Sequence, residues 1–244
     1  MKATRVGAML GFAAMVLSVS AAPVTVKWYG QSFFTLVSVS NTVVAIDPFD
    51  GTFLNYPIPQ GLKADLLLVS HEHKDHNNVA AIQGDPLLLR SERGVTKEQK
   101  KGVNVRGISA YHDDRQGAEK GRDTIYTVEM EGLRFCHLGD LGQTSLAEEQ
   151  LARIGSVDIL FMPAGGHFTT EPKDLRKLID QIKPRIVVPM HYKTAYTRDL
   201  PLAPLDVFLK LNPDLVAKKL ESTDFSVGRE QLPEKLQIWV PAVP

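Results

Sequence analysis

The sequence predicts an α/β fold in which two β-sheets pack face to face and helices cover their outer sides, a four-layer αββα sandwich. The first half of the chain contains short strand-like segments separated by turn residues, whereas the second half alternates strand-like and helix-like segments. Several strand-like segments are continuous apolar runs, which is typical of strands buried on both faces. Strands of that kind need a layer on either side, and two packed sheets with outer helices provide it.

In the first half, strands and one short helix are expected. The strands cover residues 24–29, 33–39, 42–46, 64–70, 86–90, 103–108, 124–129 and 133–138. Turn residues at 30–31 and 40–41 join the first three strands into a meander, and those at 131–132 join the last two into a hairpin. A short helix is expected over residues 77–83, where either of two asparagines at its start can cap it.

In the second half, helices alternate with strands. The expected helices cover residues 146–154, 173–182 and 204–211, and the expected strands cover residues 157–162, 185–189 and 236–240. Residues 173–182 carry apolar side chains with the spacing of one helix face. The whole pattern fits one elaborated domain over residues 23–244.

The composition is that of an ordinary globular protein. The chain has 244 residues, of which 43% are hydrophobic and 23% charged, and these values exclude disordered, collagenous and coiled-coil proteins. Lys and Arg number 28, as do Asp and Glu, so the formal net charge is zero. A balanced charge argues against a nucleic-acid binder with a broad basic face. The sequence leaves the oligomeric state open.

The first 22 residues have the pattern of a secretory signal peptide. Lys2 and Arg5 precede an uncharged apolar run over residues 6–19, and small residues follow up to Ala22. We therefore expect residues 1–22 to be removed and the protein to be secreted or periplasmic, without a stable membrane anchor. A retained anchor is the alternative, although the run is shorter than the about 20 residues that a spanning helix needs.

Residues 70–77 carry four potential metal ligands directly after a predicted buried strand. His71 and His73 are alternate residues of an extended segment and point the same way, so both can bind one ion. Asp75 and His76 lie where the chain turns, and they can face a second ion beside the first. The alternatives are a polar loop that is rich in histidine by chance and a site for one ion only.

This His-x-His-x-Asp-His motif resembles that of the metallo-β-lactamase superfamily of metal-dependent hydrolases, and further landmarks occur in the superfamily's order. They are Asp47 at an early strand end, Gly139-Asp140, and His191 at a late strand end. Residues 28–33, 163–169 and 191–194 resemble the subgroup around ascorbate-6-phosphate lactonase and the N-acyl-phosphatidylethanolamine phospholipase D type. The resemblance implies an αββα sandwich of the metallo-β-lactamase type.

The resemblance also implies two divalent metal ions, Zn²⁺ with Mn²⁺ or Fe²⁺ as alternatives. The implied ligands are His71, His73 and His112 for the first ion, Asp75, His76 and His191 for the second, and Asp140 with a hydroxide between them. Two candidates exist for the third histidine: His112, 28 residues before Asp140, and His137, three residues before it. We favour His112, because in the superfamily a strand hairpin separates this histidine from the Gly-Asp pair.

The implied activity is hydrolysis of a small-molecule substrate, an ester, lactone or phosphodiester, by the bridging hydroxide. Asp75 and Asp140 are the expected catalytic residues, Asp140 as the bridge and Asp75 as the group that orients the hydroxide. His167 and Lys193 are candidate substrate contacts, and Asp47 is either a hydrogen-bond partner of a ligand histidine or a plain strand-end aspartate. The loops expected to shape the pocket cover residues 50–61, 113–122 and 196–204. A true β-lactamase and a non-catalytic periplasmic protein that binds a metal or ligand on the same fold are the alternatives.

Overall fold

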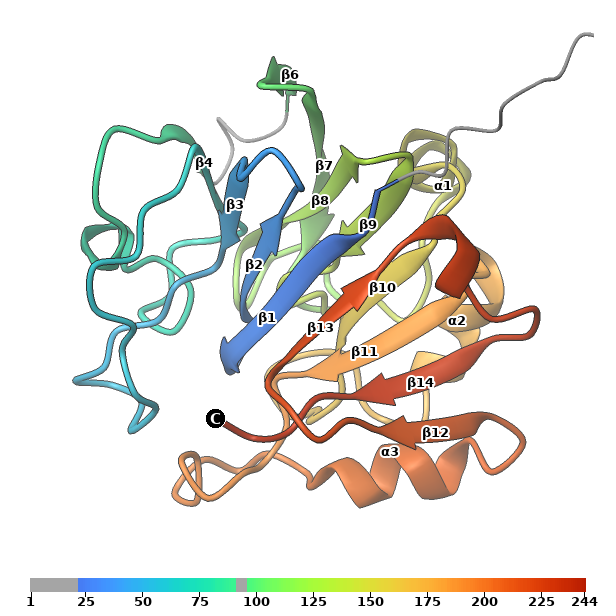
Figure 1. The fold of residues 1–244 in the computed structure, drawn as a ribbon. Helices are drawn as coiled ribbons and strands as arrows, with labels where there is room; N and C mark the ends of the chain where they lie inside the picture. Colours follow the sequence, from blue (N-terminus) through green and yellow to red (C-terminus); the bar gives the residue numbers. More distant parts are fainter. Residues whose placement is uncertain (1–21, 91–95) are drawn as a thin grey trace, which may run out of the picture.

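The computed structural model describes residues 22–90 and 96–244 of the chain. The predicted signal peptide, apart from its last residue, lies outside these described residues. Within them, two β-sheets pack against each other and three α-helices accompany one of the sheets (Figure 1). No helix in this part of the chain is both long and apolar enough to cross a membrane.

One sheet has six strands in the order β13-β1-β2-β3-β4-β5. Its members are β1 (Val24–Gly30), β2 (Phe33–Val37), β3 (Val43–Ile46), β4 (Leu66–Val69), β5 (Leu87–Arg90) and β13 (Asp224–Val227). The first three strands form the predicted antiparallel meander. Strands β3, β4 and β5 are parallel, so their carboxyl ends meet at one edge of the sheet.

The other sheet has eight strands in the order β12-β14-β11-β10-β9-β8-β7-β6. Its members are β6 (Lys97–Lys100), β7 (Val103–Tyr111), β8 (Arg122–Met130), β9 (Leu133–His137), β10 (Ile159–Pro163), β11 (Ile186–Met190), β12 (Val216–Lys219) and β14 (Gln237–Val240). Strands β9, β10 and β11 are parallel. Because β8 is antiparallel to both β7 and β9, strand β7 ends at the same edge as these three.

Three helices accompany the eight-stranded sheet: α1 (Glu148–Ile154), α2 (Leu175–Ile182) and α3 (Leu205–Leu211). In Figure 1, α1 and α2 lie behind its strands, and α3 runs below β12. The buried residues of α2 are Leu175, Leu178, Ile179 and Ile182. This spacing is the single apolar face that the sequence predicted, and it packs the helix onto the core.

The main core fills the space between the two sheets. Alternate residues of β1, such as Val26 and Trp28, are buried there, in keeping with the predicted alternation. Phe34 of β2 meets Phe161 of β10 across the gap, with ring centroids 4.4 Å apart. The predicted sandwich of two sheets is therefore confirmed.

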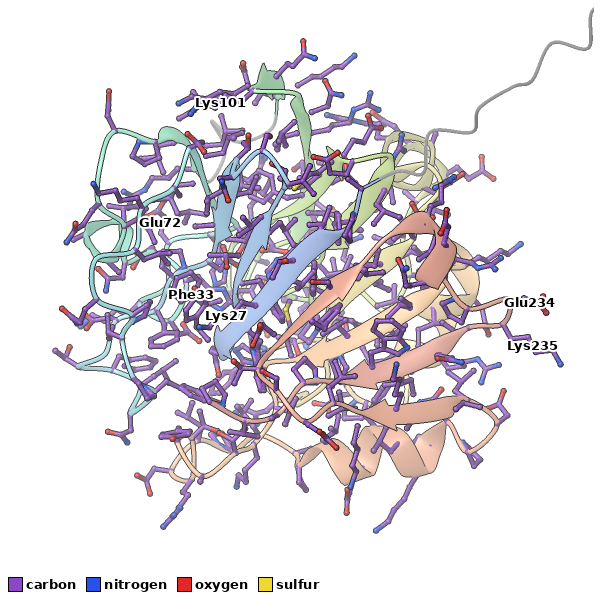
Figure 2. The ribbon with its side chains drawn as sticks, in the orientation of Figure 1. Lys27, Phe33, Glu72, Lys101, Glu234 and Lys235 are labelled. Carbon is purple, nitrogen blue, oxygen red and sulfur yellow. The ribbon has the colours of Figure 1, made fainter. Side chains whose placement is uncertain are left out.

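The outer side of the six-stranded sheet is covered by the loops between β3 and β5, which are turquoise in Figure 1. The apolar cluster on this side contains Phe33, Ala45, Phe49, Leu54, Tyr56, Leu67 and Ile82. Figure 2 shows Phe33 and Glu72 towards this side, whereas Glu234 and Lys235 project from the opposite side. The helix predicted over residues 77–83 is only a 3₁₀ turn, Val79–Ala81, because Gln83 already pairs with Lys63 in an extended bridge.

Three strands have no counterpart among the predicted elements: β6, β12 and β13. Each contains exposed polar residues and pairs at the edge of a sheet. Strand β13 adds to the six-stranded sheet beside β1, while β12 and β14 add to the other sheet. The last part of the chain therefore adds strands to both sheets. The sequences of these edge strands have little strand propensity of their own, and their pairing with distant strands holds them in place.

Candidate metal centre

The predicted site residues follow strand ends that meet at one edge of the molecule. Residues 71–76 follow β4, and Asp47 follows β3 in the same sheet. His112 follows β7, Asp140 follows β9, and His191 follows β11 in the facing sheet. Carboxyl ends of strands are the usual place for sites in α/β proteins, and the packing of the two sheets brings these loops together.

One group of converging nitrogen atoms consists of His71, His73 and His112, whose candidate ligand atoms all lie within 4.8 Å of one another. Nε2 of His71 lies 3.0 Å from Nδ1 of His73, and Nε2 of His112 lies 3.2 Å from the same atom. His71 and His112 are buried, whereas His73 is exposed. Three imidazole nitrogens in this arrangement are a suitable ligand set for Zn²⁺.

A second group consists of Asp75, His76, Asp140 and His191, again within 4.8 Å. Nε2 of His191 lies 3.4 Å from Oδ2 of Asp75 and 3.3 Å from Oδ2 of Asp140. Nε2 of His76 and Oδ1 of Asp140 are 3.2 Å apart, and both are buried without a hydrogen-bond partner among the described residues. Buried polar atoms are rarely left unpaired, and a cation between them would satisfy both, so the residues fit a metal ion.

The Asp140 carboxylate lies between the two groups. Its Oδ2 is 3.5 Å from Nε2 of His112 and 4.0 Å from Nε2 of His71, while its Oδ1 faces His76. One carboxylate thus faces nitrogen atoms of both groups. This is the arrangement in which a single side chain can bridge two ions.

Asp47 fixes the orientation of two ligand candidates. Its Oδ2 accepts a hydrogen bond from the Ser70 hydroxyl at 2.7 Å and lies 2.9 Å from Nδ1 of His76. Since the Ser70 hydroxyl donates to Asp47, its oxygen is left to accept from Nδ1 of His71, 3.0 Å away. Both imidazoles then carry their proton on Nδ1 and present Nε2 to the centre. Of the two predicted roles for Asp47, the hydrogen bond to a ligand histidine is the one observed.

His137, the rival candidate for the third histidine, lies outside both groups. Its Nδ1 accepts a hydrogen bond from the backbone N–H of Gly139, and its Nε2 donates to the carbonyl oxygen of Ser32. Both ring nitrogens are therefore engaged with the backbone. The ring packs against both Phe34 and Phe161, which makes it part of the core between the sheets.

The family of the chain follows from its sequence as well as from this geometry. The family model of the β-lactamase superfamily domain matches residues 25–191, which include all of the predicted ligands. This chain belongs to the metallo-β-lactamase superfamily. Within the superfamily, a UPF0173 metal-dependent hydrolase from Thermococcus onnurineus is 31% identical over 193 residues, covering 70% of this chain and 85% of that protein.

Solved structures agree with the assignment to the superfamily. A Thermotoga maritima protein, named as a Zn-dependent hydrolase of the metallo-β-lactamase superfamily, superposes with a TM-score of 0.71 at 28% identity. The match covers 91% of this chain and 100% of that one. A protein from Parabacteroides distasonis named as a metal-dependent hydrolase has a TM-score of 0.63 at 17% identity, and this second likeness concerns the fold alone.

The protonation states of the residues at this candidate centre suit metal binding in part. Burial, together with the neighbouring His76, lowers the pKa of His71 well below its usual value. Burial would raise the pKa of Asp140, but His191 and His76 outweigh it and keep the carboxylate ionised. Burial would lower the pKa of His76, but Asp140 and Asp75 raise it instead. A bound cation would compete with that proton, so metal binding at the second group should release protons.

Two further residues at the candidate centre, Gln31 and Asp123, were not predicted as site residues from the sequence. Gln31 is buried, and its Nε2 donates a 2.9 Å hydrogen bond to Oδ2 of Asp75. Asp123 is buried beside His71, with 3.6 Å between its Oδ1 and Nδ1 of the imidazole, and burial raises the pKa of its carboxyl group. The sequence signals for Gln31 were its position in a predicted turn and within residues 28–33, which resemble the subgroup; Asp123 had none.

Three residues of the centre have left-handed backbone conformations: Gln31 (φ +48°), Asp47 (φ +51°) and His191 (φ +51°). Such conformations cost about 1–3 kcal/mol each for residues other than glycine, and they persist where the surroundings determine them. The backbone N–H of His191 donates to the carbonyl oxygen of Gln31, so this hydrogen bond links two of the three left-handed residues.

The two predicted substrate contacts differ in their surroundings. His167 is exposed, packs against Phe168, and lines a polar cavity that also contains His112. Lys193 is half-buried, and its backbone N–H donates to the carbonyl oxygen of Ala203. The cavity directly over Asp75 and Asp140 is lined by other residues, described below.

Proposed function

We propose that this protein is a hydrolase that uses two divalent metal ions, Zn²⁺ being the favoured ion, to cleave an ester, lactone or phosphodiester. The observation that carries the proposal is the Asp140 carboxylate, which faces His112 with one oxygen atom and His76 with the other. A carboxylate so placed can hold two ions close enough to share one water. Relatives named as metal-dependent hydrolases support the same class of reaction.

When bound, two ions that share a water lower its pKa to about 7 and polarise the bond under attack. Asp75 is the side chain best placed to orient that water or carry its proton. Burial would raise the pKa of Asp75, but His76 and His191 hold it well below its usual value, so the carboxylate stays ionised. The hydrogen bond from Gln31 fixes one of its oxygen atoms.

We also propose that residues 1–22 export the protein, which rests on the basic start and the uncharged run that follows it. Export would suit a true β-lactamase as well. The resemblance argues against that activity, because in β-lactamases the position of Asp140 is not usually an aspartate that bridges metals. A cephalosporin therefore belongs in the test as the discriminating substrate.

The test combines metal analysis with a substrate panel. Purified protein should bind two equivalents of Zn²⁺ or Mn²⁺ and hydrolyse at least one of a p-nitrophenyl ester, a γ-lactone and bis-p-nitrophenyl phosphate. Chelation should remove the activity, and Asp140→Asn should lower it more than about 100-fold, beyond the effect of losing an outer hydrogen-bond partner. Two bound ions without turnover of any substrate would contradict the proposal and favour a binding protein, whereas selective cleavage of the cephalosporin would favour a β-lactamase.

A further inference from the structure

We propose that the substrate is an uncharged carboxylic ester or lactone with an apolar chain, and that this chain binds in the cavity over the metal ligands. The inference rests on the proposed function and adds the substrate class. The cavity has a volume of about 490 Å³, and its floor includes His73, Asp75, His112 and Asp140. Whatever occupies it therefore lies against the candidate reaction centre, so its lining selects the substrate.

The wall of the cavity is apolar and comes from three different loops. Phe53 lies in the loop between β3 and β4, Phe168 in the loop between β10 and α2, and Leu200 in the loop between β11 and α3. Phe53 is 50% exposed, which leaves a large apolar side chain in contact with water when the cavity contains no substrate. An apolar chain that covered these three side chains would be held by the hydrophobic effect.

One of the two lysines that line the cavity is already engaged. Lys120 lines the cavity, but its Nζ donates hydrogen bonds to the carbonyl oxygens of His167, at 3.0 Å, and Phe168, at 2.8 Å. These bonds fasten the loop between β7 and β8 to the loop that carries Phe168. Lys120 thus serves to hold the apolar wall in place, and its charge is partly satisfied by the two carbonyl groups.

The loop that carries Lys120 is itself held by Asp113. Both carboxylate oxygens of Asp113 accept hydrogen bonds from backbone N–H groups of Arg115, Gly117, Glu119 and Lys120, at 2.8–2.9 Å. Burial would raise the pKa of Asp113, but these four bonds lower it to about 2. The part of the wall that Phe168 contributes is therefore held in place before binding, which reduces the ordering cost of binding an apolar chain.

Apart from the proposed metal ions, the cavity provides few positive charges for a phosphorylated substrate. No arginine is among the described residues that line it, and Lys74 is its other lining cation. Sites that recognise phosphate groups usually provide paired Arg donors or several convergent cations. A neutral carbonyl compound needs neither, and its reacting group can reach the floor while its chain lies on the wall.

The test is a series of p-nitrophenyl esters from acetate to octanoate with metal-loaded enzyme. Each buried methylene should raise kcat/KM by up to about fourfold until the chain outgrows the cavity. We expect at least a tenfold rise from acetate to hexanoate. Phe53→Ala and Leu200→Ala should each reduce the ratio of hexanoate to acetate kcat/KM several-fold. Val39→Ala, which truncates an apolar side chain that is 58% exposed in the turn between β2 and β3, is the matched control and should leave the ratio unchanged.

Binding provides a readout that needs no turnover. Calorimetry with hexanamide and acetamide should give tighter binding of the longer amide, with a negative heat-capacity change that Phe53→Ala reduces. A flat ester series, equal affinity for the two amides, or a preference for bis-p-nitrophenyl phosphate over every ester would overturn this inference while leaving metal-dependent hydrolysis intact. If hexanamide binds in the expected way but metal-loaded protein hydrolyses nothing, the cavity stands and the proposed function fails.

Discussion

The two ligand groups of the metal centre differ in burial and in how they are held. The group of His71, His73 and His112 borders three cavities: the one over Asp75 and Asp140, one of about 690 Å³ that is lined by His71 and His73, and the polar one that is lined by His112 and His167. His73 is exposed. The group of Asp75, His76, Asp140 and His191 is more enclosed, since only Asp75 is half-buried and the other three are buried. The first group is called the open group below, and the second the enclosed group.

The hydrogen bonds sharpen this difference. In the enclosed group, Asp47 holds His76 directly and Gln31 holds Asp75. In the open group, His71 is held through Ser70, and His73 contacts its two partner histidines. Ligands that are fixed before the ion arrives bind it more tightly, so we expect the enclosed group to fill first and to exchange its ion more slowly.

The largest expected effect separates the two histidine candidates. His112→Ala should remove the ion of the open group and lower activity more than about 100-fold, since a lost ligand exceeds the loss of an outer partner. One equivalent of metal should remain, held by the enclosed group. Elemental analysis and steady-state kinetics measure both quantities.

His137→Ala is the matched variant, because both histidines are buried. It should lower the free energy of unfolding by about 1–3 kcal/mol through the lost backbone hydrogen bonds and leave the metal content unchanged. Denaturant unfolding of the variant provides the comparison. If His137→Ala strips the metal while His112→Ala retains both ions, our choice of the third histidine is wrong.

A smaller effect, on both groups, is expected from Asp47→Asn. Oδ2 of Asp47 accepts from the Ser70 hydroxyl and faces Nδ1 of His76, and its Oδ1 accepts from the backbone N–H of Ser70. An amide has one acceptor oxygen, so its NH₂ group would face a donor on one of these two sides, and the imidazole tautomers would no longer be imposed. Affinity for both ions should fall about 10–100-fold, as measured by competition with a chromophoric chelator.

Asp65→Asn is the control for that change. Asp65 also accepts a backbone hydrogen bond, from Val43, and pairs with Lys101, but it lies at the start of β4 rather than at its end. Its replacement should reduce stability slightly and leave metal affinity alone. Equal losses of affinity in the two variants would mean that general destabilisation, and not the tautomers, explains the effect.

The fold and the ligand cluster at residues 71–76 were predictable because their signals are local. A buried strand followed by alternate histidines places His71 and His73 on one side of an extended segment. The period of residues 173–182 predicted the buried face of α2. Asp140 and His191 carry no such local signal, and the sequence pointed to them through the family resemblance.

The rest depends on contacts between distant parts of the chain. Gln31 and Asp75 are 44 residues apart, and their bond forms because the turn after β1 packs beside the end of β4. Strand β6 consists of polar residues and is defined by its pairing with β7. The turn at Val79–Ala81 is short because the chain must extend again to form β5 beside β4, a constraint that the helix-capping asparagines do not reveal.

The smallest expected effects come from removing one hydrogen bond in each group, between a ligand candidate and a neighbouring residue that is not itself a ligand candidate. Gln31→Met keeps the length of the side chain but removes the donor to Asp75, so affinity for the ion of the enclosed group should fall about tenfold. Ser70→Ala removes the oxygen atom that accepts from Nδ1 of His71, so affinity for the ion of the open group should fall by a similar factor. Stepwise calorimetric titration with Zn²⁺ resolves the two binding events.

The pair of variants decides whether the two groups act separately. Selective loss at the first or the second binding step would support distinct sites that are filled in order. Asp140 faces both groups, however, and a shared ligand couples the sites whenever an ion at one of them fixes the carboxylate for the other. If Gln31→Met and Ser70→Ala weaken both steps equally, this coupling exceeds the difference in burial, and the centre behaves as a single unit despite its open and enclosed sides.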